Sequence, residues 1–215
     1  MLKKIVIIDY DLGNLFSVKQ ACEVVGLNSI ISSKKEDILN ADGLILPGVG
    51  AFNEAINNLK NRGLDSVIKL QVKKNIPLFG ICLGLQLLFS KTEEFDDGPG
   101  LDLISGSVTK IKNNLKNNKL KVPHVGWNKI YSDKFDWDNT PLESLENNNY
   151  MYFVHSYYVN PIDKSFILSN TNYESINFCS SVIKNNIFAC QFHPEKSGDK
   201  GVEIYHKWAN QNSLV

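Results

Sequence analysis

The stretch Ile76-Pro-Leu-Phe-Gly-Ile-Cys-Leu-Gly-Leu-Gln-Leu-Leu-Phe89 decides both the fold and the chemistry of this chain. Ile76 to Ile81 is a short apolar run that includes a proline, which predicts a buried strand, and Leu85 to Phe89 continues the apolar character at a helical period. Between the two lies Gly80-x-Cys82-x-Gly84. A strand, a glycine-flanked turn and a helix are typical of a nucleophile elbow, whose tight turn leaves no room for neighbouring Cβ atoms.

The cysteine in this turn is the candidate nucleophile. A cysteine at the start of a helix lies near the positive end of the helix dipole, which favours the thiolate over the thiol. The placement has kinetic consequences, because a free cysteine is only about a few per cent thiolate at neutral pH. Alternatively, Cys82 is a small buried hydrophobic residue, as free cysteines commonly are. Partners elsewhere in the chain have to decide between the two.

Composition narrows the class of protein. The 215 residues, 43% apolar and 21% charged, predict a single globular domain over 1–215, with two small domains as the alternative. Lys plus Arg equals Asp plus Glu at 23 each, so the net charge points to neither nucleic acid nor an anionic membrane. The apolar run before Asp9 is too short for a signal peptide, and no 18-residue apolar stretch predicts a membrane span. Four cysteines without a C-x-x-C pair predict a reduced, cytoplasmic setting.

The first half of the chain alternates between strand and helix patterns. The predicted strands are 5–8, 28–32, 42–47 and 76–81, and the predicted helices are 15–25, 52–59 and 64–74. This alternation predicts an α/β fold with an open, mostly parallel sheet flanked by helices. Such sheets bind ligands at the carboxyl ends of their strands, where Asn14, Gly48 to Gly50 and Cys82 lie.

The second half consists mainly of short strand patterns, which predict additional antiparallel strands on the same sheet. The segments 98–100 and 110–121 are predicted loops, and 199–210 is a closing helix. The predicted strands are 107–111, 128–131, 151–159, 166–170, 180–184 and 187–192.

A histidine and a glutamate follow the last predicted strand, in Ile187-Phe-Ala-Cys-Gln-Phe-His-Pro-Glu195. Positions two apart on an extended chain point the same way, and Pro194 keeps the segment out of a helix. Glu195 then orients His193, whose other nitrogen faces the nucleophile, as in a catalytic triad. The alternative is a surface turn. A zinc site is not predicted, because the Pro-Cys-x-x-Cys that accompanies His-x-Glu in zinc deaminases is absent, and the sequence predicts no cofactor.

Gly48-Val49-Gly50 follows another strand and supplies the remaining part of such a site. A glycine-bounded loop can turn backbone N–H groups toward a developing oxyanion, as can the N–H of Leu83 directly after the nucleophile. A plain turn between strand and helix explains the segment equally well.

Taken together, three motifs resemble the class I glutamine amidotransferases: Leu46-Pro-Gly-Val-Gly-Ala-Phe52, Gly80-Ile-Cys-Leu-Gly-Leu-Gln86 and Gln191-Phe-His-Pro-Glu195. Three more segments resemble the glutaminase subunits of imidazole glycerol phosphate synthase, an enzyme of histidine biosynthesis. They are Asp9-Tyr-x-x-Gly-Asn14, Val122-Pro-His-Val-Gly-Trp-Asn128 and Tyr152-Phe-Val-His-Ser-Tyr157. Asp11 is a departure, because glycine is expected there, and it puts the local conformation near Asn14 in doubt.

The resemblance implies that the substrate is glutamine, which Cys82 converts through a thioester to glutamate and ammonia. Cys82, His193 and Glu195 would be the catalytic residues, and the N–H groups of Val49, Gly50 and Leu83 the oxyanion hole. The implied glutamine site comprises Gly48, Gln86, His155, Ser156 and Tyr157. The side chain of His155 is alternatively an ordinary strand histidine with its hydrogen bonds satisfied.

The resemblance also implies a partner, a (β/α)8-barrel synthase subunit on a separate chain that receives the ammonia in a heterodimer and makes imidazole glycerol phosphate and AICAR. Glutamine turnover is expected to be slow without it. The residues that we place at this interface are Asn14, Trp127, Asn128 and Lys196. Aromatic residues are frequent hot spots of interfaces, although Trp127 is alternatively a core residue and Lys196 a solvated charge.

Three other functions stay open on the sequence alone. A related amidotransferase subunit could supply ammonia for a surface sugar, since the acceptor binds to the other chain. A non-catalytic assembly subunit could keep the fold, although the intact Cys82, His193 and Glu195 argue against it. A cysteine hydrolase acting on γ-glutamyl peptides would share the same core but gives no reason for the Val125-Gly-Trp-Asn128 segment.

Overall fold

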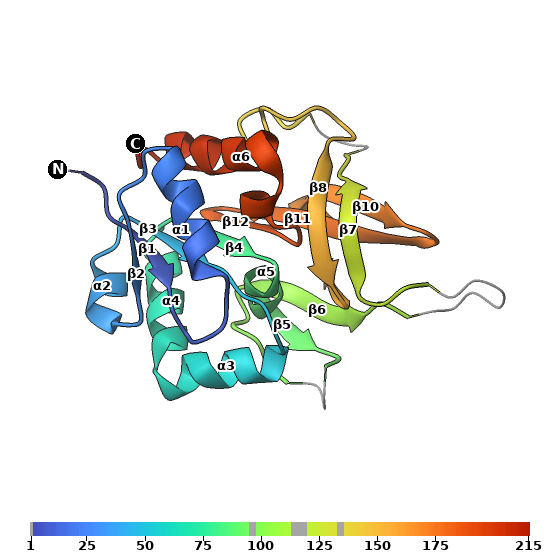
Figure 1. Cartoon of the computed structure of the whole chain (residues 1–215). Helices are drawn as coiled ribbons and strands as arrows, with labels where there is room; N and C mark the ends of the chain where they lie inside the picture. The colour runs from blue at the N-terminus through green and yellow to red at the C-terminus, as the bar shows by residue number, and fades with distance from the viewer. Residues whose placement is uncertain (1, 95–97, 113–119, 133–135) are drawn as a thin grey trace.

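The protein is described here by a computed structural model that covers residues 2–94, 98–112, 120–132 and 136–215. A mixed ten-stranded sheet separates two layers of helices (Figure 1). One layer contains α1 (Leu15–Val24) and α6 (Gly198–Gln211), and the other contains α2 (Lys35–Leu39), α3 (Phe52–Asn61) and α4 (Leu64–Lys73). Each face of the sheet therefore has its own hydrophobic core.

The parallel part of the sheet comes from the first half of the chain. Its strands are β1 (Ile5–Ile8), β2 (Ser29–Ser32), β3 (Gly43–Leu46) and β4 (Leu78–Ile81), in the order β2-β1-β3-β4. Every residue of β1, β3 and β4 is buried, as expected for apolar runs covered by helices on both faces. The four strands predicted here are confirmed, with ends that differ by one or two residues.

The helices form because their apolar residues recur at helical spacing. In α3 the buried residues are Phe52, Ala55, Ile56 and Leu59, which line one face of the helix. In α6 they include Ile204, Tyr205 and Trp208, and Trp208 packs against Phe79 of β4. The predicted helices 15–25, 52–59, 64–74 and 199–210 are confirmed, whereas the five-residue α2 was not predicted.

The second half extends the sheet with mostly antiparallel pairs, so the predicted fold class is confirmed. β12 (Ile187–Cys190) joins β4 in parallel, and the order then runs through β11, β9 and β6 to β5. These strands are β11 (Ile176–Lys184), β9 (Tyr157–Pro161), β6 (Ile104–Lys110) and β5 (Phe89–Thr92), with β10 (Ile167–Tyr173) on β11. Two short 3-10 helices, η1 (Lys164–Phe166) and η2 (Pro194–Lys196), complete the chain.

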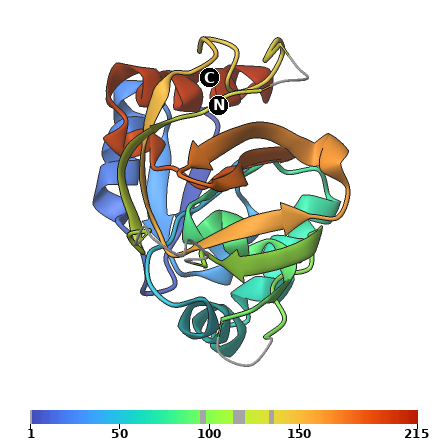
Figure 2. The ribbon, with the colours of Figure 1, turned by 90° about the vertical axis from the view of Figure 1, so that its right-hand side faces the viewer.

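The single strand predicted over 151–159 is wrong, because the chain changes sheets at Ser156. β8 (Tyr150–His155) pairs with β7 (His124–Lys129) in a separate two-stranded sheet, whereas β9 returns to the main sheet. The two-stranded sheet stands at one end of the molecule (Figures 1 and 2). No glycine or proline marks the junction. The strand predicted over 128–131 likewise begins earlier, at His124, and ends at Lys129.

The helix after Cys82 begins and ends two residues earlier than the predicted 85–89. α5 (Leu83–Leu87) ends before Phe89, which begins β5 and pairs with Ile104. The sequence does not indicate where the helix ends, because the residues from Leu83 to Phe89 are nearly all apolar and all of them are buried. Such a run has no periodicity that distinguishes a helix from a strand. Residues 113–119 of the predicted loop 110–121 lie outside the part of the chain that the structure describes. Within the described part of the chain, no helix combines the length and apolar character needed to cross a membrane.

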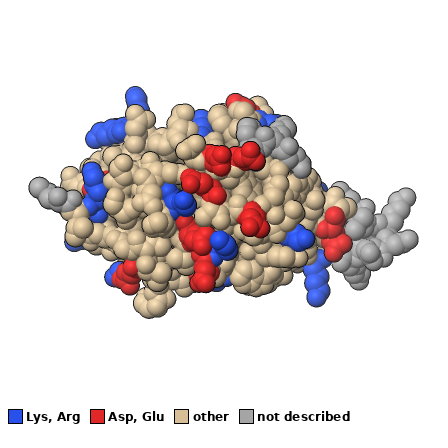
Figure 3. Space-filling model, turned by 90° about the horizontal axis from the view of Figure 1, so that it is seen from above, with Lys and Arg blue, Asp and Glu red and all other residues tan. Residues whose placement is uncertain are grey.

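The charges on the surface are mixed. Viewed from above, the molecule shows Asp and Glu near the middle of one face with Lys and Arg among and around them (Figure 3). This agrees with the balanced net charge of the sequence.

Candidate active site

Cys82 stands on the turn between β4 and α5. Its φ of 54° and ψ of −106° are unusual for a residue other than glycine, a strain of roughly 1–3 kcal/mol that the surroundings must offset. The Cys82 N–H donates to the carbonyl of Cys190 on the neighbouring strand at 2.8 Å. A Cβ on Gly84 would lie 1.8 Å from the carbonyl oxygen of Leu46, which explains why the turn requires glycine there.

His193 reaches this turn because β12 lies beside β4, with Cys190 opposite Ile81. Its Nδ1 is 2.8 Å from Oε1 of Glu195, and the two side chains are 2% and 1% exposed. The predicted reason for this pairing is wrong, because β12 ends at Cys190 and Glu195 lies in the 3-10 helix η2. The tight turn, rather than the period of a strand, brings the carboxylate back to the imidazole.

The electrostatics of His193 link it to the cysteine. Burial alone would lower the pKa of the imidazole, but the Cys82 sulfur and the Glu195 carboxylate outweigh it and raise the pKa to about 10. Among the described residues, Nε2 of His193 has no hydrogen bond of normal geometry, yet Cys82 is near enough to shift its pKa. An imidazole held between a carboxylate and a sulfur can carry a proton to and from a reacting group.

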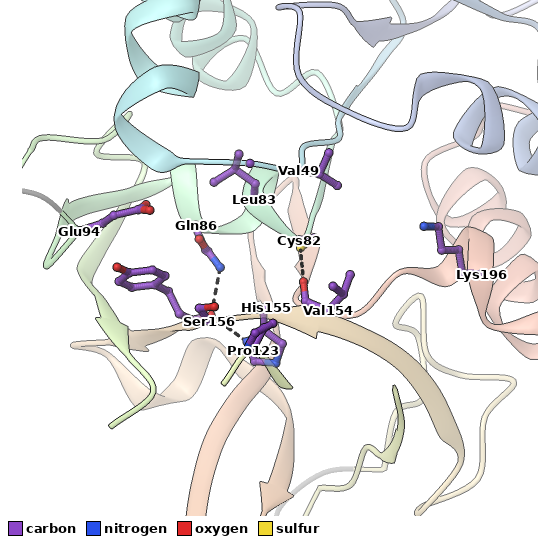
Figure 4. Close-up of a pocket in the computed structure, with 12 residues that line it drawn as sticks. Val49, Cys82, Leu83, Gln86, Glu94, Pro123, Val154, His155, Ser156 and Lys196 are labelled. Atoms are coloured by element: carbon purple, nitrogen blue, oxygen red, sulfur yellow. Dashed lines mark hydrogen bonds between the residues drawn. The ribbon is translucent and has the colours of Figure 1, made fainter. Parts of the chain in front are cut away.

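A pocket of about 450 Å³ opens at the sulfur, large enough for an amino acid. Val49 and Leu83 lie on one side of Cys82, and the β8–β9 turn lies on the other (Figure 4). The lining residues are Val49, Gly50, Cys82, Leu83, Gln86, Glu94, Pro123, Val154, His155, Ser156, Tyr157 and Lys196. Gly48, the remaining residue of the predicted glutamine site, lies next to this wall and is buried.

Gln86 and Gln191 connect the pocket wall to the sulfur. The Gln86 Nε2 donates to the Tyr157 carbonyl and to Gln191 Oε1, both at 3.1 Å. The Gln191 Nε2 in turn donates to the Cys82 sulfur at 3.6 Å. Gln191 was not predicted as a site residue, although its motif was recognised, because only the pairing of β12 with β4 places it there.

Glu94 is the second site residue that sequence reasoning missed. It is 8% exposed, and its Oε2 accepts the N–H of Phe52, the first residue of α3, at 2.8 Å. The carboxylate lies at the end of the pocket opposite Lys196 (Figure 4). No motif surrounds it in the sequence, so only the tertiary structure reveals a buried anion in the pocket.

The predicted oxyanion donors are not all free. The Leu83 N–H donates to the Gly48 carbonyl at 3.3 Å, and the Tyr10 hydroxyl donates to the Pro47 carbonyl at 2.6 Å. Because a trans peptide points its C=O and N–H in opposite directions, the N–H of Val49 faces away from Leu83. A rotation of the Gly48–Val49 peptide would release the Leu83 N–H and turn the Val49 N–H toward the pocket.

The four predicted interface residues lie in different settings. Asn14 caps α1, accepting the N–H of Ser17 at 3.5 Å, and the Asn128 Nδ2 donates to the Asn172 carbonyl at 2.9 Å. Trp127 is 54% exposed, so the core alternative for this residue is wrong. Lys196 is exposed, and its ammonium lies 6.0 Å from the centre of the Tyr152 ring.

Asp11, the departure noted in the sequence, has a φ of 72°. This left-handed conformation explains why glycine is expected at the position. The Asp11 carboxylate forms an ion pair with Arg62 at the end of α3, and the nearby Asn58 Nδ2 donates to the Tyr10 carbonyl at 3.1 Å. These contacts hold the 9–14 turn against α3. Among the described residues, no cluster of His, Cys, Asp and Glu could hold a metal ion.

The comparisons with known proteins show the family to which the chain belongs. The family model for "Glutamine amidotransferase class-I" matches residues 6–209. A similar protein from Caldanaerobacter subterraneus, the "Imidazole glycerol phosphate synthase subunit HisH", is 46% identical over 92% of this chain and 93% of its own. The "Imidazole glycerol phosphate synthase subunit HisH 1" of Methanococcus maripaludis is 43% identical over 93% and 96%.

Solved structures share the fold at lower identity. A "Crystal structure of glutamine amidotransferase" has a TM-score of 0.72 and 17% identity, covering 97% of this chain and 98% of that one.

Proposed function

This chain belongs to the class I glutamine amidotransferases, and from that premise we propose that it is the glutaminase subunit of an imidazole glycerol phosphate synthase in histidine biosynthesis. The observation that carries the proposal is the buried His193–Glu195 pair directed at the strained Cys82. Relatives with the same printed function cover nearly the whole chain at more than 40% identity. The geometry of the site and the similarity to these relatives therefore support the same activity.

Glutamine hydrolysis would proceed in two steps at these three residues. The Cys82 thiolate attacks the side-chain amide carbon of glutamine, and His193 gives its proton to the leaving nitrogen as the C–N bond breaks and ammonia departs. Water then attacks the thioester, His193 accepts the water proton, and the C–S bond breaks to release glutamate. Glu195 keeps the imidazole oriented. Proton transfer of this kind contributes about 10²–10⁴ in rate.

The pocket supports glutamine as the substrate. A free amino acid carries an ammonium group, and the buried Glu94 carboxylate is an anion on the pocket wall that can bind it. Gln86 and the backbone of Ser156 and Tyr157 border the same space. The amide of the substrate would then lie toward Cys82.

The conformation of the 47–50 loop supports control by a partner. With the Leu83 N–H bound to the Gly48 carbonyl, the oxyanion hole is incomplete, and one missing donor costs about 10²–10³ in rate. Binding of the (β/α)8 synthase subunit would shift the Gly48–Val49 peptide to its active orientation. The interface would include Asn14, Trp127, Asn128 and Lys196 in a heterodimer that carries ammonia to the second active site.

The experiment that tests this function mixes the purified chain with the barrel subunit and measures synthesis from glutamine and from ammonia side by side. We expect Cys82→Ala to abolish glutamine-dependent synthesis and to leave ammonia-dependent synthesis unchanged. Equal glutaminase rates with and without the barrel subunit would refute the coupling. Synthesis with a sugar-modifying synthase instead of the histidine-pathway enzyme would assign the chain to the other pathway.

A further inference from the structure

Two histidines outside the triad form a buried pair beside the pocket. His124 opens β7 and His155 ends β8, and they are 3% and 5% exposed. The His124 Nδ1 lies 2.9 Å from the His155 Nε2. Neither imidazole takes part in the proton transfers of glutamine hydrolysis, so the pair needs another explanation.

The hydrogen bonds of this pair run in only one direction. The His155 Nδ1 lies 2.8 Å from the Tyr157 carbonyl, which can only accept, so Nδ1 carries the proton. The His155 Nε2 then accepts from the His124 Nδ1. The His124 Nε2 accepts in turn from the Asn128 Nδ2 at 3.4 Å. Both rings are therefore the Nδ1–H tautomer.

The neighbours of Asn128 and His124 exclude the opposite arrangement. The Asn128 Oδ1 accepts the Lys129 N–H at 2.8 Å, and its Nδ2 donates to the Asn172 carbonyl at 2.9 Å, so the amide cannot turn over without losing both bonds. The His124 ring stacks on Tyr173 with centroids 3.9 Å apart. Burial lowers the pKa of His124 to about 4 and that of His155 to about 3, so both are neutral at physiological pH.

The hydrogen bonds of the histidine pair continue through Tyr157, Gln86 and Gln191 to the nucleophile. The Tyr157 carbonyl that accepts from His155 also accepts from the Gln86 Nε2 at 3.1 Å. Gln86 is bonded to Gln191, and Gln191 donates to the Cys82 sulfur. In Figure 4, Gln86 and the turn that contains His155 and Ser156 face each other across the pocket. Hydrogen bonds thus connect β7, in the two-stranded sheet, with the sulfur in the main sheet.

We propose that His124 and His155 are positioning residues that hold the 155–157 turn in the shape that binds glutamine. The proposal rests on the proposed function, since the turn has this role only in a glutaminase. The turn is the junction at which β8 leaves one sheet and β9 enters the other, and it has no glycine or proline to define its shape. The His155 side chain supplies the missing constraint, and His124 fixes the tautomer of His155.

Substitutions can test the roles of the two ring nitrogens of each histidine separately. In His155→Asn the side-chain amide takes the place of Nδ1 and still donates to Tyr157, whereas in His155→Gln it takes the place of Nε2 and the Tyr157 bond is lost. In His124→Asn the donor to His155 remains, and in His124→Phe only the stacking ring remains. His206→Gln is the matched control, because His206 is exposed on α6.

The variants are assayed for glutamine hydrolysis in the complex with the barrel subunit. We expect the KM for glutamine to rise roughly 10-fold in His155→Gln and His124→Phe, the loss of about one hydrogen bond. His206→Gln should stay within about threefold of the unaltered complex, and each Asn variant should raise the KM less than the variant at the same position that loses the hydrogen bond. His124 does not line the pocket, so it can affect the KM only through His155. If His124 were merely structural, His124→Phe would not raise the KM and His124→Asn would not restore it.

Two measurements on the chain alone keep the proposal testable. Nitrogen-15 NMR of the imidazoles should show Nδ1–H and unprotonated Nε2 for both rings, and an Nε2–H tautomer at His155 would overturn the proposal. Alkylation of Cys82 by iodoacetamide should change less than about twofold in each variant, since the triad is untouched.

The outcomes distinguish the two proposals. An unaltered complex that does not hydrolyse glutamine would refute the proposed function and with it the role of the pair. Normal hydrolysis with an unchanged KM in His155→Gln and His124→Phe would refute the positioning role alone.

Discussion

The two sides of the pocket differ in how completely they are assembled. On the triad side, Cys82, His193 and Glu195 are buried and held by hydrogen bonds to neighbouring strands and turns. On the oxyanion side, Val49 is 38% exposed, Gly50 has a φ of 114°, and the Leu83 N–H is bound to the Gly48 carbonyl. The difference teaches that the three triad side chains are already assembled, whereas the backbone N–H groups proposed to stabilise the tetrahedral intermediate are not, and on the proposed function the loop would therefore control the rate.

The largest effect is expected on the triad side. Glu195→Gln keeps the shape of the side chain but removes the charge that supports the His193 imidazolium, so the pKa of His193 should fall. We expect kcat for glutamine to drop by about 10²–10⁴, measured in the complex across a range of pH. Glu203→Gln on the exposed side of α6 is the control. An unchanged kcat would mean that the preformed pair has no catalytic role.

The next effect concerns the partner that should assemble the loop. Trp127→Ala removes an exposed aromatic side chain from the proposed interface, and hot-spot aromatics contribute about 2 kcal/mol or more to binding. We expect the Kd for the barrel subunit to rise at least about 10-fold, measured by titration calorimetry. The rate of Cys82 alkylation in the free chain should not change. An unaltered Kd would place the interface elsewhere, and the similarly exposed Tyr150→Ala serves for comparison.

A smaller effect is expected from the residue that anchors the loop. Tyr10→Phe removes the hydrogen bond to the Pro47 carbonyl and leaves the buried ring in place. The loop should then leave its present conformation more easily, and glutamine turnover without the partner should rise about fivefold, the equivalent of roughly 1 kcal/mol. Tyr150→Phe, an exposed position, is the control. A fall in partner-free turnover would show that Tyr10 supports the active loop instead.

The last prediction concerns stability rather than rate or binding, and it is a pH dependence caused by the buried His155. His155 has a folded pKa of about 3, chiefly because burial penalises the charged ring, against an ordinary value of 6.5. Between these values the unfolded chain binds a proton that the folded chain does not. The stability that His155 contributes above pH 6.5 is therefore lost as the pH falls toward 3, by at most about 1.4 kcal/mol per pH unit.

Urea unfolding at several pH values should show a smaller slope of unfolding free energy against pH for His155→Asn than for the unaltered chain. His206→Gln, at an exposed position, should keep the slope of the unaltered chain. Equal slopes in His155→Asn and the unaltered chain would mean that folding does not lower the pKa of His155.

The local pattern of the sequence determined most elements of the fold and the candidate nucleophile. Apolar β-branched runs such as Ile5–Ile8 form strands covered on both faces wherever they pack, and the Gly80-x-Cys82-x-Gly84 turn depends on steric limits within a few residues. The spacing of Phe52, Ala55, Ile56 and Leu59 likewise defines a helix face without further information.

Only the tertiary structure decided which sheet a strand joins and which polar groups meet. The sequence pattern along 151–159 is the same whether or not the chain changes sheets at Ser156. The pattern indicates which face of a strand each side chain points to, but it does not indicate which strand pairs with it. Glu94 and Gln191 enter the site through contacts with residues 42 and more than 100 positions away, respectively. The hydrogen bond between the Leu83 N–H and the Gly48 carbonyl is also decided by the tertiary structure, because it joins two backbone groups and no sequence pattern indicates it.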